Sequence, residues 1–387
     1  MERISCTPRE NYREIVEKQG FGFHESYWME DACYCFTSAE IEALEKATAE
    51  CYEMYCKAVE ACLYDNRRLD ALCIPVAVRE AIVRSWEEDD YSLYGRFDFA
   101  FVNGVPKLLE FNADTPTSLV EAAVIQWLWK EDVFPECDQF NGIHEGLVQS
   151  WKDIFPKKGE IHFAGALENN KYIHERYQCG RYYFASISDC LEDNATLGYI
   201  ISTAFEAGLV PYELDIRSIR HENGSLFAPD GMPIDCMFKL YPWEFMFAED
   251  LTGCMTEMCW IEPLWKALMS DKAMLPVLYE MFPRSPYILP AYAEPGKLGA
   301  YCKKPVFSRE GANVELVKNG TILESSSGGY GKEGYIYQQL VDIPCFDGRY
   351  PVLGSWVIGG EAAGMGIREN TSRITDDMSH FVPHIIV

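Results

Sequence analysis

Residues 94–112 read YGRFDFAFVNGVPKLLEFN and predict a β-hairpin that carries polar groups on one face. Two aromatic-rich runs flank a central Asn-Gly dipeptide, which is typical of tight hairpin turns. Side chains alternate between the two faces of a strand, so Arg96 and Asp98 share a face of the first strand. Glu110 and Asn112 share a face of the second strand for the same reason.

The register of the hairpin decides whether these polar pairs meet. A two-residue loop would set Val102 opposite Val105 and send the pairs to opposite faces. A shift of one residue, with Val102 opposite Pro106, sets Asp98 against Glu110. We choose the shifted register because it separates polar from apolar residues almost completely. It requires an odd-membered loop or a bulge, and proline suits such a margin. The other face then gathers Phe97, Phe99, Phe101, Leu109 and Phe111.

The polar face suggests phosphoryl chemistry. Asp98, Glu110 and Asn112 offer two carboxylates and an amide oxygen, a set of hard ligands suited to Mg²⁺. Arg96 lies beside them and could hold a phosphate group through two hydrogen bonds. The alternative is a solvated antiparallel face with one cross-strand ion pair.

Composition predicts one large folded unit over residues 1–387. Hydrophobic residues make up 48% of the chain, and no linker or low-complexity tract divides it. The formal charge of −26 argues against nucleic acid as a partner. The longest apolar runs fall well short of the roughly 20 residues that span a bilayer, so we expect no membrane segment. An odd number of cysteines, 15, and the lack of a signal peptide predict reduced thiols and a cytoplasmic protein.

Hydrophobic periodicity predicts helices around the hairpin. The first spans 37–65, with Thr37 as its N-cap and Glu40 placed for a capping box. A second covers 76–90, and a third, 119–129, follows a turn-rich loop over 113–118 whose Asp, Thr and Ser residues could cap it. We assign no role to the isolated histidines His144, His162, His174 and His221.

The middle of the chain predicts an α/β layer. Residues 160–165, 181–187 and 209–214 favour strands, and 195–207 favour a helix before the last of them. Glu192 and Asp193 belong to an acidic cluster at a helix start. Such a cluster either compensates the helix dipole or receives a cationic amine.

The last third predicts a nucleotide site. A strand over 301–307, a glycine-rich loop over 325–334, a strand over 335–340 and Arg368 within a further strand follow one another. No Walker loop or dinucleotide fingerprint is present. Glycine loops with lysines, facing a separate acidic site, suggest that residues 260–387 hold a nucleotide against the metal hairpin 94–112.

Several long motifs in order resemble the glutathionylspermidine synthase family, in particular its stand-alone synthetase-like members. They are residues 96–98 (RFD), 108–118 (LLEFNADTPTS), 238–244 (FKLYPWE), 304–313 (KPVFSREGAN) and 366–368 (GIR). The resemblance runs over 1–387 and implies an ATP-grasp-type fold of the α+β or α/β class, with the nucleotide held between structural units.

The resemblance also implies roles for individual residues. Asp98, Glu110 and Asn112 would bind Mg²⁺, and Arg96 and Arg368 would face the transferred phosphate. ATP would be held by Lys272, Lys304, Gln338, Gln339 and Leu340, and substrate by Ser118, Glu192 and Asp193.

The implied reaction is acid–amine ligation. ATP phosphorylates a small carboxylic acid or peptide, and an amine attacks the acyl phosphate. The chain has no room for the amidase domain of bifunctional members, and its 113–118 and 374–379 loops differ from theirs, so substrates stay open. Two alternatives are a nucleotide-binding regulator without turnover and a small-molecule kinase.

Overall fold

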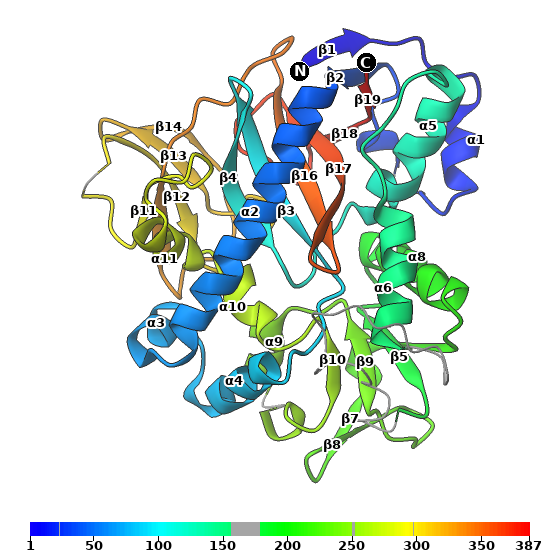
Figure 1. The fold of residues 1–387 in the computed structure, drawn as a ribbon, viewed down its shortest axis with the longest axis vertical. Coiled ribbons are helices and arrows are strands. Elements are labelled where there is room, and N and C mark those ends of the chain that lie inside the picture. Colours follow the sequence, from blue (N-terminus) through cyan, green and yellow to red (C-terminus); the bar gives the residue numbers. More distant parts are fainter. Residues whose placement is uncertain (23, 156–178, 250–251, 297) are drawn as a thin grey trace.

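The computed structural model describes residues 1–387 except 23, 156–178, 250–251 and 297. At its centre lies a five-stranded antiparallel sheet (Figure 1). The strands, in spatial order, are β18 (His380–Val382), β17 (Glu361–Asn370), β16 (Tyr350–Ile358), β3 (Tyr94–Val102) and β4 (Val105–Asn112).

In the hairpin β3–β4 the polar pairs lie opposite each other, as predicted, but the turn and the bulge differ from those expected. Asp98 pairs with Glu110, and Arg96 pairs with Asn112. At the turn, however, Val102 pairs with Val105, so the expected odd-membered loop is wrong. A bulge shifts the register next to Phe99 and leaves Leu109 as the extra residue.

The bulge also corrects the predicted core. Leu108, opposite Phe99, is fully buried, whereas Leu109 is only half-buried and lines a cavity. An extra residue in one strand reverses the alternation of its side chains, which is why the apolar face takes Leu108 instead of Leu109.

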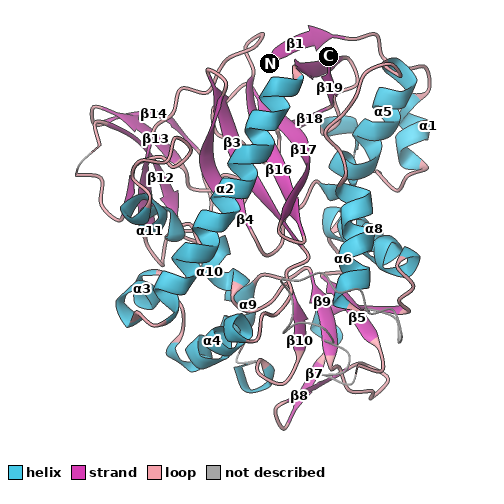
Figure 2. Cartoon of the chain, in the orientation of Figure 1, coloured by secondary structure: helices cyan, strands magenta, loops and turns pink. Residues whose placement is uncertain are grey.

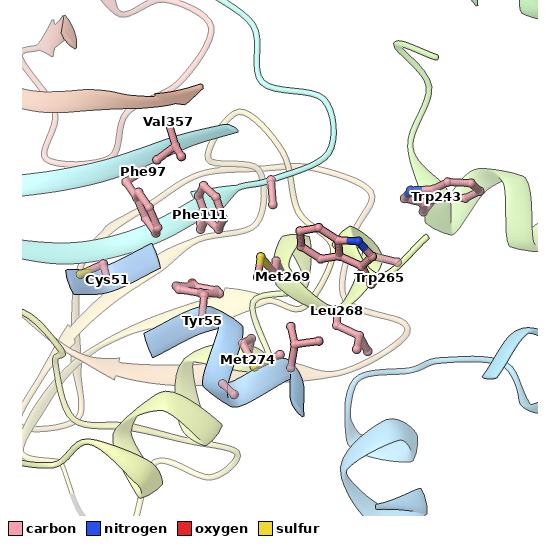
Figure 3. Close-up of a cluster of buried hydrophobic side chains, with 14 of the residues drawn as sticks. Cys51, Tyr55, Phe97, Phe111, Trp243, Trp265, Leu268, Met269, Met274 and Val357 are labelled. Atoms are coloured by element: carbon pink, nitrogen blue, oxygen red, sulfur yellow. The ribbon is translucent and has the colours of Figure 1, made fainter. Parts of the chain in front are cut away.

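Helix α2 (Ser38–Leu63) crosses the apolar face of the central sheet (Figure 1). Thr37 and Glu40 form the predicted capping box at its start. Phe97 and Phe111 stack with ring centroids 3.8 Å apart, and Tyr55 of α2 packs edge-on against Phe111 at 5.0 Å (Figure 3). This packing directs the opposite, polar face of the hairpin away from α2.

A second five-stranded sheet lies beside the hairpin, next to β4 in Figure 1. Its strands, in spatial order, are β11 (Ala291–Tyr292), β15 (Tyr335–Gln339), β12 (Ala300–Pro305), β13 (Glu315–Lys318) and β14 (Thr321–Ser325). The glycine-rich loop predicted over 325–334 connects β14 to β15 across this sheet.

A parallel sheet confirms the predicted α/β layer, although residues 160–165 lie outside the described part of the chain. It contains β10 (Cys259–Ile261), β9 (Cys236–Lys239), β5 (Tyr182–Ser186) and β6 (Pro211–Asp215). The remaining strands are β1 (Glu2–Ser5), β2 (Ala32–Phe36) and β19 (His384–Ile386), which pair together, and the small hairpin of β7 (Arg220–Glu222) and β8 (Ser225–Phe227).

Helices surround the sheets, and α5, α6 and α8 follow one side of the molecule (Figure 2). Besides α2, the helices in the described part of the chain are α1 (Tyr12–Glu17), α3 (Asn66–Ala71), α4 (Arg79–Glu87), α5 (Gln126–Val133), α6 (Ile143–Ile154), α8 (Leu191–Glu206), α9 (Trp243–Ala248), α10 (Lys266–Ser270) and α11 (Met274–Met281). Short turns are η1 (His24–Ser26), η2 (Val76–Val78), η3 (Glu121–Ile125), η4 (Ile216–Ser218) and η5 (Thr252–Cys254).

The helix predicted over 119–129 starts differently from our expectation. Its first part, η3, is a π-helical turn, and no side chain caps it. Ser118 adopts a left-handed backbone conformation, with φ of 66°, and turns the chain into η3. The expected capped α-helical N-terminus beside the metal residues is therefore absent among the described residues.

The described residues contain no membrane-spanning helix and no disulfide bond. None of the helices found there is both long and apolar enough to cross a membrane. None of the 15 cysteines, all of which lie in the described part of the chain, forms a disulfide bond, and Cys345 is the only exposed one among them.

Candidate active site

Asp98 lies between two arginines on the polar face of the central sheet. Arg96 Nε donates to its Oδ1 at 2.8 Å, and Arg368 Nη2, from β17, donates to its Oδ2 at 2.6 Å. Burial alone would raise the pKa of Asp98, but the two guanidinium groups outweigh burial and hold the pKa below its ordinary value. Asp98 is therefore a carboxylate at neutral pH.

One glycine makes room for this arrangement. A Cβ at Gly354 of β16 would lie 2.8 Å from Cδ of Arg96, so glycine lets the arginine side chain cross the strand. Arg96 continues over the ring of Trp356 at 5.9 Å and donates to the carbonyl oxygen of Thr117 at 2.6 Å. The guanidinium is thus held in place from three directions.

Glu110 faces lysines instead of arginines. Lys272 Nζ lies 3.4 Å from its Oε2, and Lys304 acts on it from β12. Burial favours the neutral acid, but the two ammonium groups prevail and lower the pKa of Glu110. Four cationic side chains thus converge on a pair of carboxylates.

The bulge links the two five-stranded sheets. The carbonyl oxygen of Leu109 accepts a hydrogen bond from Lys304 Nζ, and that of Leu108 accepts one from Gln338 Nε2, both at 2.9 Å. Lys304 also donates to Oε1 of Gln338 at 2.9 Å. Disrupted pairing at a bulge leaves carbonyl groups free to bind other partners, and here they bind the neighbouring sheet.

A cavity of about 100 Å³ lies between the two sheets. All five residues predicted to bind nucleotide line it, together with both predicted metal carboxylates: Lys272, Lys304, Gln338, Gln339, Leu340, Asp98 and Glu110. Apolar walls from Leu109, Val314, Leu316 and Val352 complete it. An apolar slot with cationic groups at one end has the chemistry to hold a base and its phosphates.

A second cavity, of about 220 Å³, lies on the other side of Lys272 and Ser308, which line both cavities. Asn112 opens into it, and its wall carries both signs of charge, with Asp271, Glu244 and Arg309 among the lining residues. Asp271 Oδ2 is buried without a hydrogen-bond partner among the described residues.

Salt bridges connect the motifs that the sequence displayed separately. Buried Lys239 donates to Asp114 Oδ1 at 2.7 Å, and the backbone N–H of Trp243 donates to its Oδ2 at 2.8 Å. Arg309 donates to Thr115 Oγ1 at 2.7 Å and to Glu244 Oε1 at 2.8 Å. These contacts fix the loop after β4 to α9 and to the loop after β12.

Lys239, Glu244 and Arg309 belong to the motifs at 238–244 and 304–313, but the sequence alone predicted no role for them. Their partners lie 65 to 194 residues away in the sequence. An apolar strand that contains a lysine was the available signal, since a buried lysine requires a partner.

The predicted substrate residues lie at the edge of the same site. Ser118 Oγ and Tyr27 Oη share a hydrogen bond of 2.6 Å. Glu192 and Asp193 lie in the first turn of α8, as predicted, and Glu192 acts electrostatically on Glu121 of η3. Burial raises the pKa of Asp193. Within the described residues, no group of three or more His, Cys, Asp or Glu side chains could hold a metal ion.

A family model described as "Glutathionylspermidine synthase preATP-grasp" matches residues 3–387. The chain belongs to this family. Its known relatives are ligases, which confirms the resemblance seen in the motifs.

Among the relatives, a "Putative acid--amine ligase" of Haemophilus influenzae is 36% identical over 383 residues, covering 93% of this chain and 91% of that protein. A trypanothione synthetase of Crithidia fasciculata is 28% identical, and the match covers 84% of this chain and 52% of that protein. The bifunctional glutathionylspermidine synthetase/amidase of Escherichia coli is 26% identical and matches over 92% of this chain and 59% of its own. The chain thus spans little more than half of the two longer relatives.

A solved structure supports the fold of this glutathionylspermidine synthase family member. A glutathione synthetase-like effector from Globodera pallida, in its apo form, superposes with a TM-score of 0.56 at 11% identity, covering 99% of this chain and all of the other. The mixed α/β fold is therefore shared with glutathione synthetase-like proteins.

Proposed function

We propose that the protein is an ATP-dependent acid–amine ligase of the ATP-grasp type, which forms an amide bond through an acyl phosphate. One observation carries this proposal: the paired carboxylates Asp98 and Glu110 and their cationic partners border the cavity lined by Lys272, Lys304 and Gln338. Two relatives, one named a putative acid–amine ligase and the other a glutathionylspermidine synthetase/amidase, support amide ligation.

The cavity between the two sheets is lined by the kinds of groups that would bind ATP. Gln338, Gln339 and Leu340, at the end of β15 and just after it, line this cavity together with its apolar walls, where the adenine would lie. Lys272 and Lys304 lie at the end of the cavity nearest Glu110, where they would neutralise phosphate oxygens. Neither lysine needs to change its protonation state for this role.

Mg²⁺ fits the donor set on the hairpin. Asp98 and Glu110 lie directly opposite each other as carboxylates, and Asn112 lies two residues further along the strand. When bound there, Mg²⁺ would supply charge that draws electron density from the phosphoryl group. Hard oxygen donors in this number suit Mg²⁺ with water completing its ligands.

The arginines would stabilise the negative charge of the phosphoryl group during its transfer and in the acyl phosphate. Arg96 and Arg368 reach the same carboxylate from β3 and β17, so both point to the place where negative charge develops. Losing one such contact commonly costs about 10²–10³ in rate. Ser118, Glu192 and Asp193 would contact substrate, and the 220 Å³ cavity offers space for the remainder of the carboxylic acid.

A trapping experiment tests this function without knowledge of the amine. Purified protein, Mg-ATP, hydroxylamine and single carboxylic acids or peptides, glutathione included, are incubated, and hydroxamate, ADP and phosphate are measured. A ligase forms hydroxamate and ADP in equal amounts with a suitable acid. ADP with a phosphorylated acid that resists hydroxylamine identifies a kinase, and nucleotide binding without ADP identifies a regulator.

A further inference from the structure

Two buried ion pairs hold the open end of the β3–β4 hairpin from the parallel sheet, which lies below the central sheet in Figure 1. Lys239, the last residue of β9, pairs with Asp114, two residues after β4. Glu262, directly after the neighbouring strand β10, pairs with Lys266. All four side chains are at most 1% exposed. A buried ion pair adds little net stability compared with well-packed apolar side chains, so what it holds in place is the informative property.

Glu262 and Lys266 hold the strand side of this end. The backbone N–H groups of Leu93 and Tyr94 both donate to Glu262 Oε1 at 3.0 Å. Lys266 Nζ donates to the carbonyl oxygen of Tyr94 at 3.1 Å. The start of β3, two residues before Arg96, is therefore held through its backbone.

Lys239 holds the loop side. Its Nζ donates to Asp114 Oδ1 at 2.7 Å and to the carbonyl oxygen of Tyr241 at 2.9 Å, and it lies 4.0 Å from the centre of the Trp243 ring. Asp114 Oδ2 accepts a hydrogen bond of 2.8 Å from the backbone N–H of Trp243. Both oxygens of Asp114 are thus occupied, so the residue cannot turn without breaking a buried hydrogen bond.

The anchored loop supplies one of the contacts that orient Arg96. Arg96 Nη1 donates to the carbonyl oxygen of Thr117 at 2.6 Å, three residues after Asp114. Ser118, with φ of 66°, turns the chain directly after this carbonyl. The direction of the Thr117 carbonyl, and with it the plane of the Arg96 guanidinium, therefore depends on where residues 113–118 lie.

We propose that Lys239 is a positioning residue, which orients Arg96 for phosphoryl transfer by anchoring residues 113–118 through Asp114. The proposal rests on the ligase function above, since that function gives Arg96 its task. Among the described residues that line the two cavities, Lys239 is absent. An error of about 1 Å in the position of a reacting group can cost about 10² in rate, so an anchor outside both cavities can still set the rate.

Lys239→Met tests the role, because it removes the ammonium group and keeps an unbranched side chain. With Mg-ATP, hydroxylamine and an acid that the trapping experiment identifies, kcat should fall about 10²-fold. The dissociation constant of a non-hydrolysable ATP analogue should stay within about threefold of wild type, because Lys239 does not line the nucleotide cavity. Arg9→Met, which breaks the buried Arg9–Glu30 pair, is the matched control and should leave kcat within about threefold.

A double-mutant cycle with Arg96 separates positioning from a general loss of stability. If Lys239 acts through Arg96, adding Lys239→Met to Arg96→Ala should lower kcat by less than about threefold further. Losses that multiply would show that Lys239 acts elsewhere and would overturn the proposal.

A second variant covers the case in which Lys239→Met does not fold. Lys239→Met combined with Asp114→Asn leaves no unpaired buried charge and keeps an oxygen for the Trp243 N–H. It should fold, with kcat about tenfold below wild type, since the link from residue 114 to Tyr241 is missing. A wild-type kcat in this variant would overturn the positioning role.

Hydrogen exchange supplies a readout that does not depend on turnover. Relative to amides of β17, those of residues 113–118 should exchange about tenfold faster in Lys239→Met than in wild type. The same comparison in Arg9→Met should show no difference. Equal relative exchange in Lys239→Met and wild type would overturn the anchoring.

The outcomes distinguish the two proposals. Unchanged exchange over 113–118, or multiplying losses with Arg96→Ala, overturns the role of Lys239, while hydroxamate formed by the wild type upholds the ligase function. ADP without hydroxamate overturns the ligase function, and the cycle is then measured on ADP formation. If the wild type forms no ADP with any acid, the role of Lys239 in phosphoryl transfer is overturned together with the ligase function.

Discussion

At the scale of single residues, Asp98 and Glu110 are the two groups on which the proposed chemistry depends. They face each other across the hairpin, and each is kept ionised by its own cationic partners. A shared metal would make them act as a unit.

Asp98→Asn and Glu110→Gln should each reduce ATP turnover by about 10² or more, and the double variant should be little worse than either one. Single-turnover measurements of ADP formation check this. Losses that multiply in the double variant would show two independent roles and contradict the shared metal.

At the scale of elements, the bulge at Leu109 joins the β3–β4 hairpin to the cavity between the two sheets. It places the carbonyl oxygens of Leu108 and Leu109 within hydrogen-bonding distance of Gln338 and Lys304. Deleting Leu109 would restore a regular two-residue hairpin in which the residues Asp98 and Glu110 still pair, because the bulge contributes one extra residue.

Deletion of Leu109 should therefore weaken ATP binding about tenfold, the equivalent of roughly one hydrogen bond to a charged group, with a smaller effect on turnover at saturating ATP. Calorimetric titration with a non-hydrolysable analogue measures the affinity. Leu323→Ala, on a partly exposed β14 position, is a suitable control. An unchanged affinity would mean that the bulge carbonyls do not position Lys304.

The loop between β14 and β15 carries a second prediction at this scale. Lys332 and Glu333 are exposed, while Gly331 and Gly334 have φ values of 113° and 110°, which suit glycine. If the loop closes over ATP and excludes water, hydrogen exchange over 325–334 should slow with Mg²⁺ and a non-hydrolysable analogue. The exposed turn at Asn319-Gly320 provides an internal reference. Equal exchange with and without nucleotide would exclude a covering role.

The sequence predicted the helices and strands better than the places where one element packs on another. Local patterns were sufficient for the capping box at Thr37 and for the opposed pairs on the hairpin, since alternation and polarity reside in adjacent residues. The bulge at Leu109 and the π-helical turn at Glu121 depend on partners from β12, β15 and β17, distant in the chain. Glu121 was missed because its significance arises from burial, which a single glutamate in an apolar run does not reveal.

At the scale of the whole molecule, Glu121 should make the free energy of unfolding depend on pH. Its pKa is raised by burial to about 8 in the folded state but is near the ordinary 4.5 when unfolded. Between these values the folded state holds a proton that the unfolded state lacks, so this group's contribution falls as pH rises. Above pH 8 the folded protein bears the whole cost of a buried charge.

Glu121→Gln should therefore become more stable relative to wild type as pH rises from 5 to 8, by at most about 4 kcal/mol at about 1.4 kcal/mol per unit. Thermal unfolding at several pH values measures the difference, with Glu145→Gln, an exposed change on α6, as control. A gap that stays constant over this range would show that Glu121 titrates normally.

The double contact of Asp98 also bears on how the protein responds to its surroundings. Both oxygens already accept hydrogen bonds from guanidinium groups, and four cations surround the two carboxylates. A free divalent ion would meet a cluster that is positive already, whereas an ion carried by a triphosphate brings anionic oxygens to which the displaced arginines and lysines can turn. The site would then bind the metal–nucleotide complex but not the free metal ion.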